Sequence, residues 1–121
     1  NIMKTNNYHS YLQSLIGKEI DVIIDRPIRS VHPVHKDIIY DVNYGYTKLV
    51  IAPDNEYQDV YVLGVDNPIE NYKGEVKAIV HRLNDNEDKL VVGPKDVLYT
   101  CEEIKTKINF IEKFFEIEII L

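Results

Sequence analysis

Residues 38–65, IIYDVNYGYTKLVIAPDNEYQDVYVLGV, decide the fold class of this chain. They contain short runs rich in β-branched and aromatic residues, bounded by Gly, Pro, Asn or Asp, at 38–46, 47–53 and 58–65. Runs of this kind predict β-strands. The pattern recurs on both sides of the stretch, at 19–24, 75–83 and 88–94. About five or six strands at a spacing of roughly 10–12 residues predict a small antiparallel barrel or sandwich.

One helix is predicted near the C-terminal end. Thr100 and Glu103 have the Thr-x-x-Glu spacing of a capping box. Residues 116–121 alternate too briefly for an assignment, so they either extend this helix or return as a last strand. The apolar residues after the cap recur at helical spacing and would form one face: Ile104, Ile108, Ile111 and Phe115.

The length and charge of the chain restrict its class. A chain of 121 residues predicts one domain with a single modest core, here a barrel over residues 19–121 after an N-terminal extension over residues 1–18. Lysine and arginine number 14 against 20 aspartates and glutamates, a formal charge of −6. That sign argues against a nucleic-acid binder, whose phosphate contacts need basic clusters, although nine tyrosines could otherwise stack on bases.

Two further features bear on the compartment. The chain has one cysteine, which excludes an internal disulfide and fits a reducing environment. Its apolar runs are too short to span a membrane, and residues 1–13 lack the apolar core of a signal peptide. We therefore expect a cytoplasmic protein.

Three carboxylates precede an apolar run in the middle of the chain. Asp54, Glu56 and Asp59 fall within six residues. Two like charges ~4 Å apart repel by about 4 kcal/mol at an effective dielectric constant of ~20, so such a cluster needs either open water or a cation. Acidic turns are commonly just solvated, and the cluster alone favours that interpretation over a cation site.

A second acidic set lies before the last run of the predicted sheet. Asp85, Glu87 and Asp88 precede Lys89, and Asp25 ends the first predicted strand. Because strand ends of a closed barrel share a rim, these carboxylates could surround one hollow. Carboxylate oxygens are the ligands that Mg²⁺ and Mn²⁺ prefer.

The order of the motifs favours the cation. The segments YDVNYGY (40–46), DNEYQD (54–59) and DNEDKLVV (85–92) follow one another in a way that resembles the soluble, family I inorganic pyrophosphatases. The resemblance covers about residues 21–92, with a weaker match in the final helix. It implies a mainly β (α+β) fold, a small closed OB-like antiparallel β-barrel with a C-terminal helix packed against it. It also implies a homo-oligomer.

The resemblance also implies roles for individual residues. Glu56 takes the position of the general base for the attacking water. Tyr44 and Lys89 match phosphate contacts with a catalytic role, and Tyr40 matches the first tyrosine of its segment. The positions of the family's metal ligands fall on Asp25, Asp54, Asp59, Asp85 and one of Glu87 or Asp88, of which Asp88 is the prediction. The implied cofactor is Mg²⁺, with Mn²⁺ as the alternative.

The chain departs from the family in three places. Glu56 stands where the family has aspartate, and Tyr57 replaces a proline of the same signature. A short loop replaces a hairpin that supplies a lysine, a glutamate and an arginine. Its basic residues Arg29 and Lys36 are the predicted substitutes, with His32 and His35 as further candidates. A Tyr-Lys pair of the final helix is replaced by Phe115 and Glu116.

The predicted function is therefore the metal-dependent hydrolysis of pyrophosphate at a reduced phosphate site. Two alternatives stay open. One is a hydrolase of another phosphoanhydride or of a phosphate ester. The other is a pseudoenzyme that keeps the barrel for binding or assembly.

Overall fold

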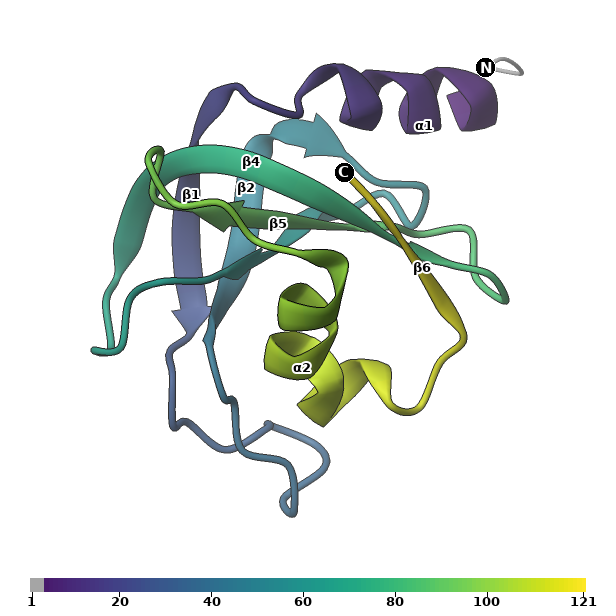
Figure 1. Cartoon of the computed structure of the whole chain (residues 1–121). Helices are drawn as coiled ribbons and strands as arrows, with labels where there is room; N and C mark the ends of the chain where they lie inside the picture. Colours follow the sequence, from purple (N-terminus) through teal and green to yellow (C-terminus); the bar gives the residue numbers. More distant parts are fainter. Residues whose placement is uncertain (1–3) are drawn as a thin grey trace.

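The computed structural model describes residues 4–121, with side chains from residue 7 onward (Figure 1). Its elements are α1 (Lys4–Ser14), β1 (Glu19–Arg26), β2 (Asn43–Ile51), β3 (Tyr57–Val62), β4 (Asn71–Arg82), β5 (Lys89–Gly93), α2 (Cys101–Glu112) and β6 (Ile117–Ile120). None of the helices in this part of the chain is long and apolar enough to cross a membrane.

The first five strands form a closed barrel. Their order is β1-β2-β3-β5-β4, and β1 also pairs with β4 to close the ring. The short β6 adds to the free side of β4. The predicted OB-like barrel is thus confirmed, with one difference. The β3–β5 pairing is parallel, because β5 turns back from β4 and inserts beside β3, while the other pairings are antiparallel.

The predicted strands at 38–46 and 47–53 are one strand. β2 runs through the expected boundary, and the irregularity there is a register shift between Thr47 and Ile51. Gly45 lies at the closest approach to β1, where a Cβ atom would be 1.8 Å from the carbonyl oxygen of Ile23. The glycine therefore marks close contact between two strands, and not a turn.

Two buried clusters occupy opposite faces of the sheet. Val60 and Val62 of β3 belong to a cluster with residues of all five barrel strands, which fills the barrel interior. The intervening Tyr61 belongs to the second cluster, which includes Ile104 and Ile108 of α2. Because successive strand residues point to opposite faces, β3 separates the interior of the barrel from the outer wall that α2 covers.

Helix α1 is absent from the sequence prediction. It lies across one end of the barrel (Figure 1), and Tyr8, Leu12 and Leu15 join the interior cluster. These residues are spaced by four and three, which is a helical period. The signal was weak because most other residues of this segment are polar.

Helix α2 begins with the predicted capping box. The Thr100 hydroxyl accepts a hydrogen bond from the Glu103 amide (3.1 Å), and Glu103 Oε1 accepts one from the Thr100 amide (2.8 Å). After the helix, residues 117–120 return as β6 and pair with β4, so the second of the two open possibilities for the tail is correct.

We expect Thr100→Ala to lower the free energy of unfolding by about 1 kcal/mol, because it removes an acceptor for an otherwise unpaired helix amide. Urea titration followed by circular dichroism would measure the change. Thr100→Ser keeps the hydroxyl and serves as the matched control. Equal stability of the alanine variant and the parent would contradict the capping role.

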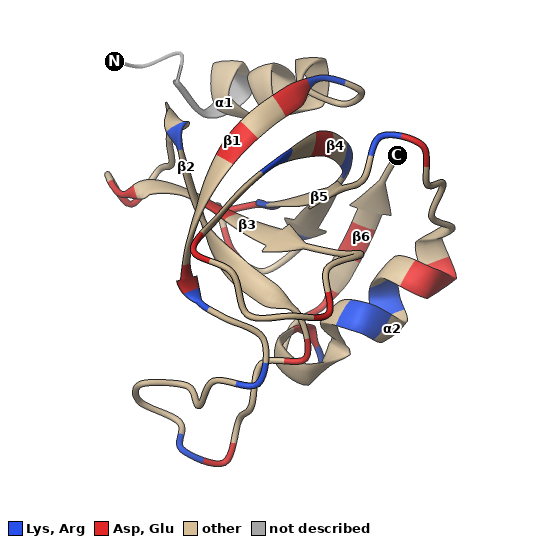
Figure 2. Cartoon of the chain, turned by 90° about the vertical axis from the view of Figure 1, so that its left-hand side faces the viewer, with Lys and Arg blue, Asp and Glu red and all other residues tan. Residues whose placement is uncertain are grey.

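Charged residues are distributed over many parts of the surface. Figure 2 shows Asp and Glu on several strands and loops, and both signs of charge along α2. The helix carries Glu102 and Glu103 in its first turn, which suits the positive end of its dipole, and no basic residue in its last turn. The acidic Glu112 at the end of α2 therefore has no basic neighbour in that turn.

Candidate active site

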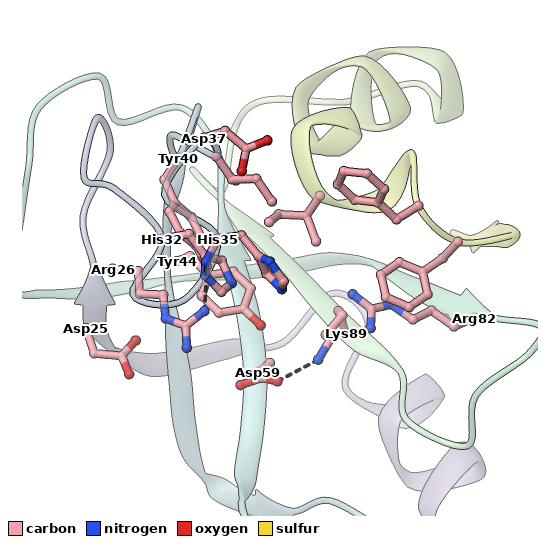
Figure 3. Close-up of a pocket in the computed structure, with 14 residues that line it drawn as sticks. Asp25, Arg26, His32, His35, Asp37, Tyr40, Tyr44, Asp59, Arg82 and Lys89 are labelled. Atoms are coloured by element: carbon pink, nitrogen blue, oxygen red, sulfur yellow. Dashed lines mark hydrogen bonds and ion pairs between the residues drawn. The ribbon is translucent and has the colours of Figure 1, made fainter.

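A cavity of about 600 Å³ lies between the barrel wall, the 27–42 loop and the C-terminal end of α2. Figure 3 shows the side chains that converge on it. Every barrel strand contributes at least one residue, and the loop and the segment after α2 complete the wall. The lining residues are Asp25, Arg26, His32, His35, Asp37, Ile38, Tyr40, Tyr44, Asp59, Arg82, Lys89, Ile111, Phe114 and Phe115.

An ion pair between Asp59 and Lys89 lies at the strand-built side of the cavity. The parallel pairing of β3 and β5 brings Val60 opposite Leu90, so the residues before them are neighbours. Lys89 Nζ donates to Asp59 Oδ2 at 2.6 Å (Figure 3), and the lysine side chain is only 7% exposed. Glu87 Oε1 lies 4.0 Å from the same ammonium group. One buried cation is therefore held between two carboxylates.

Carboxylates crowd this region. Burial, with a hydrogen bond to Asp54 and the charge of Asp54 adding to it, raises the pKa of Glu87 to about 7 against the opposing charge of Lys89. Burial also raises the pKa of Asp25, where the neighbouring charge of Arg26 opposes the shift and that of Asp59 adds to it. Burial disfavours the charged form of both carboxylates, and the neighbouring acids add to the effect. Oxygen donors in this state suit a hard divalent cation.

Stability of the metal-free protein should fall as pH rises from about 4.5 to about 7, through the contribution of Glu87. Its pKa is about 7 in the folded protein against 4.5 ordinarily, so the folded state holds the proton more tightly. That contribution is complete below the unfolded pKa and is lost as pH passes the folded pKa. The difference in unfolding free energy between the parent and Glu87→Gln, measured by denaturant titration with a chelator across this range, isolates it. A pH-independent difference would contradict the shift.

Arginine and tyrosine form another side of the cavity. Arg26 Nη1 donates to the Tyr40 hydroxyl at 2.5 Å, and its guanidinium carbon lies 5.7 Å from the ring centres of both Tyr40 and Tyr44. Burial raises the pKa of Tyr44 well above its ordinary value, and the charge of Asp59 adds to the effect. The Tyr44 hydroxyl therefore stays protonated and available as a hydrogen-bond donor.

Arg82 supplies a further cation from the last position of β4. It donates to both carboxylate oxygens of Glu112, from Nε at 3.0 Å and from Nη2 at 2.7 Å. Tyr61 donates its hydroxyl to the same carboxylate. The Phe115 ring covers the guanidinium, with 3.7 Å between its centre and Cζ. Arg82 is thus fixed from two sides before any ligand arrives.

Five of the predicted site residues line the cavity: Asp25, Tyr40, Tyr44, Asp59 and Lys89. The predicted loop substitutes do not. Arg29 donates to the Asp66 carbonyl at 3.1 Å, and Lys36 is exposed on the loop. The further candidates His32 and His35 do line the cavity, together with Asp37, which the sequence did not predict.

The other predicted carboxylates lie outside the lining. Glu56 is exposed in the turn between β2 and β3, and Asp54 accepts a hydrogen bond from its amide at 3.0 Å. Asp85 stabilises the next turn by accepting the Glu87 amide at 3.1 Å. Asp88 Oδ1 and Oδ2 contact His81 and His9 instead. Both turns use aspartate for a local backbone contact, which is its common role there.

Two lining cations are missing from the sequence prediction, Arg26 and Arg82. Arg26 directly follows the predicted metal ligand Asp25 at the end of β1. Its place next to a predicted site residue could have identified it from the sequence. Arg82 lies in a run otherwise rich in apolar residues, and its partner Glu112 is 30 residues away on a helix. No local pattern connects the two.

Comparisons with protein-family models and with curated proteins find no match. Among solved structures, the inorganic pyrophosphatase of Ehrlichia chaffeensis matches with a TM-score of 0.67 and 17% identity, over 85% of each chain. That of Coxiella burnetii gives 0.61 and 18%, over 84% of this chain and 77% of the other. That of Helicobacter pylori gives 0.60 and 14%, over 86% and 84%. Together with the barrel described above, these matches establish that the chain has the fold of the soluble, family I inorganic pyrophosphatases.

Proposed function

We propose that this protein is a metal-dependent hydrolase of inorganic pyrophosphate and that the cavity described above is its active site. The observation that carries the proposal is the Asp59–Lys89 pair in that cavity, placed by the parallel strands of a pyrophosphatase-like barrel. Around the pair, the lining combines three carboxylates with three arginine or lysine cations. The fold similarity supplies the substrate class, since the structural neighbours are named as inorganic pyrophosphatases.

The charge balance of the lining supports a need for metal. The carboxylates of Asp25, Asp37 and Asp59 offset the cations of Arg26, Arg82 and Lys89, so the cavity alone offers no excess of positive charge to a multiply anionic substrate. We propose that Asp59 holds Mg²⁺ or Mn²⁺ together with Glu87, whose Oε1 lies 4.0 Å from the Lys89 ammonium group that Asp59 contacts, and with its hydrogen-bonding partner Asp54. When bound, the cation would neutralise charge on the substrate and make a water molecule more acidic.

The chain's own residues would bind and orient the phosphate groups. Lys89 and Arg26 present cationic donors to phosphoryl oxygens, and the protonated Tyr44 hydroxyl adds a neutral donor. Phe114 and Phe115 form an apolar wall on the α2 side. Such a wall reduces access of bulk water and strengthens the polar contacts opposite.

The proton acceptor for the attacking water is a carboxylate. The resemblance gives this role to Glu56, which is exposed and outside the lining. We propose Asp25 instead, because it lines the cavity and has a raised pKa, which suits a general base. The two assignments differ in the pH–rate profile, since Asp25→Asn would remove its acidic limb and Glu56→Gln would leave it in place.

A phosphate-release assay tests the proposal. The purified chain would be given pyrophosphate, tripolyphosphate, nucleoside triphosphates and phosphate monoesters, each with Mg²⁺, with Mn²⁺ and with a chelator. Preferential, metal-dependent hydrolysis of pyrophosphate is expected. Preference for a nucleotide or an ester would select the alternative hydrolase. A folded protein without turnover on any substrate would select the pseudoenzyme.

The predicted homo-oligomer remains a proposal that rests on the resemblance. Phe114 and Leu121, at 63% and 58% exposure, leave apolar surface exposed near the C-terminal end. Exposed apolar groups of this kind are common at subunit contacts. Light scattering of the purified protein would give the subunit number.

A further inference from the structure

A second cluster of ionisable side chains lies apart from the cavity. It joins His9 of α1, His81 of β4 and Asp88, the residue before β5. The Nδ1 atom of each histidine lies 2.8 Å from a different oxygen of the Asp88 carboxylate. Donor atoms of all three residues lie within 4.8 Å of one another. The two rings meet edge to face, 5.6 Å apart at 88°. None of the three lines the cavity of the proposed active site.

The environment of Asp88 requires positive charge. Its side chain is only 2% exposed, and among the side chains from residue 7 onward no lysine or arginine pairs with it. A buried carboxylate is strongly disfavoured unless a cation or several donors compensate it. Within the side chains from residue 7 onward, the imidazoles of His9 and His81 are the only basic groups that contact the Asp88 carboxylate. They can compensate it by hydrogen bonding, or together with it they can hold a metal ion.

We propose that His9, His81 and Asp88 form a binding site for a divalent transition-metal ion of the Zn²⁺ class. Two imidazole nitrogens and one carboxylate are a ligand set for Zn²⁺, Co²⁺ or Ni²⁺, whereas Mg²⁺ prefers oxygen ligands alone. The site is therefore chemically distinct from the all-carboxylate set of the proposed active site. This proposal does not rest on the proposed function.

The donor atoms, all within 4.8 Å of one another, need shifts of at most about 1.5 Å to accept the ion. Ligand bonds of about 2.0–2.2 Å in a tetrahedral zinc site place donor atoms roughly 3.3 Å apart. The nitrogen–oxygen separations of 2.8 Å would thus open by about half an ångström. The side chains of His9 and His81 are 28% and 31% exposed, so one side of the cluster faces solvent. A water molecule can complete the coordination from that side.

The ion would fasten α1 to the barrel. The helix already contacts it through Leu12 in the interior cluster and through the Tyr8 hydroxyl, which donates to Gln58. His9 adds a link to the β4–β5 hairpin, because its partner Asp88 lies directly before Lys89. A metal that binds only the folded chain stabilises it by RT ln(1 + [L]/Kd), so the stabilisation grows with the free metal concentration. We therefore expect Zn²⁺ to raise the melting temperature of the protein.

Calorimetric titration of the full chain with Zn²⁺ tests the site. The protein is first freed of metal with a chelator, and the titration is run near pH 7.5 with excess Mg²⁺ to occupy all-carboxylate sites. One ion per chain is expected, with an affinity that falls at least about tenfold in His9→Gln and in His81→Gln. The visible absorption of bound Co²⁺ would report tetrahedral nitrogen-containing coordination independently.

The chain contains a matched control. His32 and His35 form another close pair, with ring centres 5.0 Å apart, but no carboxylate pairs with either in the described residues. His35→Gln should bind Zn²⁺ like the parent. If Asp88→Asn fails to fold, the two histidine variants still decide the question. The proposal is overturned if the parent binds no Zn²⁺, or if His9→Gln and His81→Gln bind it as tightly as the parent.

Discussion

Asp59→Asn is expected to lower kcat/KM for pyrophosphate on the order of 100-fold or more, and to raise the Mg²⁺ concentration needed for half-maximal rate. Asp59 is the lining carboxylate that contacts Lys89, so it connects the proposed metal ligands to the proposed phosphate contact. The amide keeps the size of the side chain but removes its charge, and hard cations depend on few carboxylates. Removal of one preorganised electrostatic contact commonly costs about 100- to 1,000-fold in rate.

The control for this variant is Asp96→Asn, an exposed aspartate in the segment after β5 that is not part of the cavity lining. It makes the same chemical change and should leave both constants as in the parent. Circular dichroism and thermal unfolding of Asp59→Asn should show a folded protein, because Glu87 still lies 4.0 Å from the Lys89 ammonium group. Unchanged turnover with unchanged Mg²⁺ dependence would refute the role of Asp59.

The local pattern of the chain predicts the strands well, because turn residues and β-branched runs are local signals. The prediction is wrong where a residue is set by a contact with a distant part of the chain. The sequence predicts a strand boundary after Tyr46, but β2 continues through it, and the preceding Gly45 is there because β1 passes within contact distance. Helix α1 was not predicted for the opposite reason, because it has a tertiary role with little local signal. Its apolar residues are few, and their partners are barrel residues far along the chain.

Alternation along a strand explains which of two neighbouring acids faces the proposed site. Glu87 and Lys89 are two residues apart, and Asp88 lies between them. In extended backbone the first two share a face and the middle one points the other way. The structure follows this rule, with Glu87 near the Lys89 ammonium group and Asp88 against two histidines. The period of two was readable in the sequence, although the histidine partners were not.

Long-range pairs account for the rest of the cavity. Tyr40, Tyr44, Asp59 and Lys89 sit in recognisable motifs, so the sequence predicts them as a set. Arg82 becomes part of the wall only through Glu112 and Phe115, which come from the end of α2 and the segment after it. The position of Phe115 and Glu116 in place of a Tyr-Lys pair predicted a loss of phosphate contacts. The aromatic ring there instead covers an arginine that lines the cavity.

Loss of Glu112 should strongly reduce stability. This glutamate is the last residue of α2 and is only 3% exposed, and its carboxylate accepts from Arg82 twice and from Tyr61 once. An acid at a helix C-terminus is unfavourable to the helix dipole, and this last turn holds no basic residue. The position is therefore explained by the tertiary contact with Arg82. Burial, with Glu112 next in effect, also raises the pKa of Tyr61 well above its ordinary value, so its hydroxyl remains a donor.

Glu112→Ala should therefore lower the free energy of unfolding by about 3 kcal/mol, because it leaves the buried Arg82 guanidinium with only the more distant Asp85 carboxylate, at 3.8 Å, as an anion. Denaturant unfolding would measure this, with Glu102→Ala on the same helix as a control that should stay within about 0.5 kcal/mol of the parent. The cost arises from the unpaired charge and not from the absence of the pair itself. The double variant Arg82→Met/Glu112→Leu should consequently be more stable than Glu112→Ala, since apolar replacement of both partners of a buried pair is often neutral. If the single variant loses less than about 1 kcal/mol, or if the double variant is less stable than it, the ion pair does not hold α2 to the barrel.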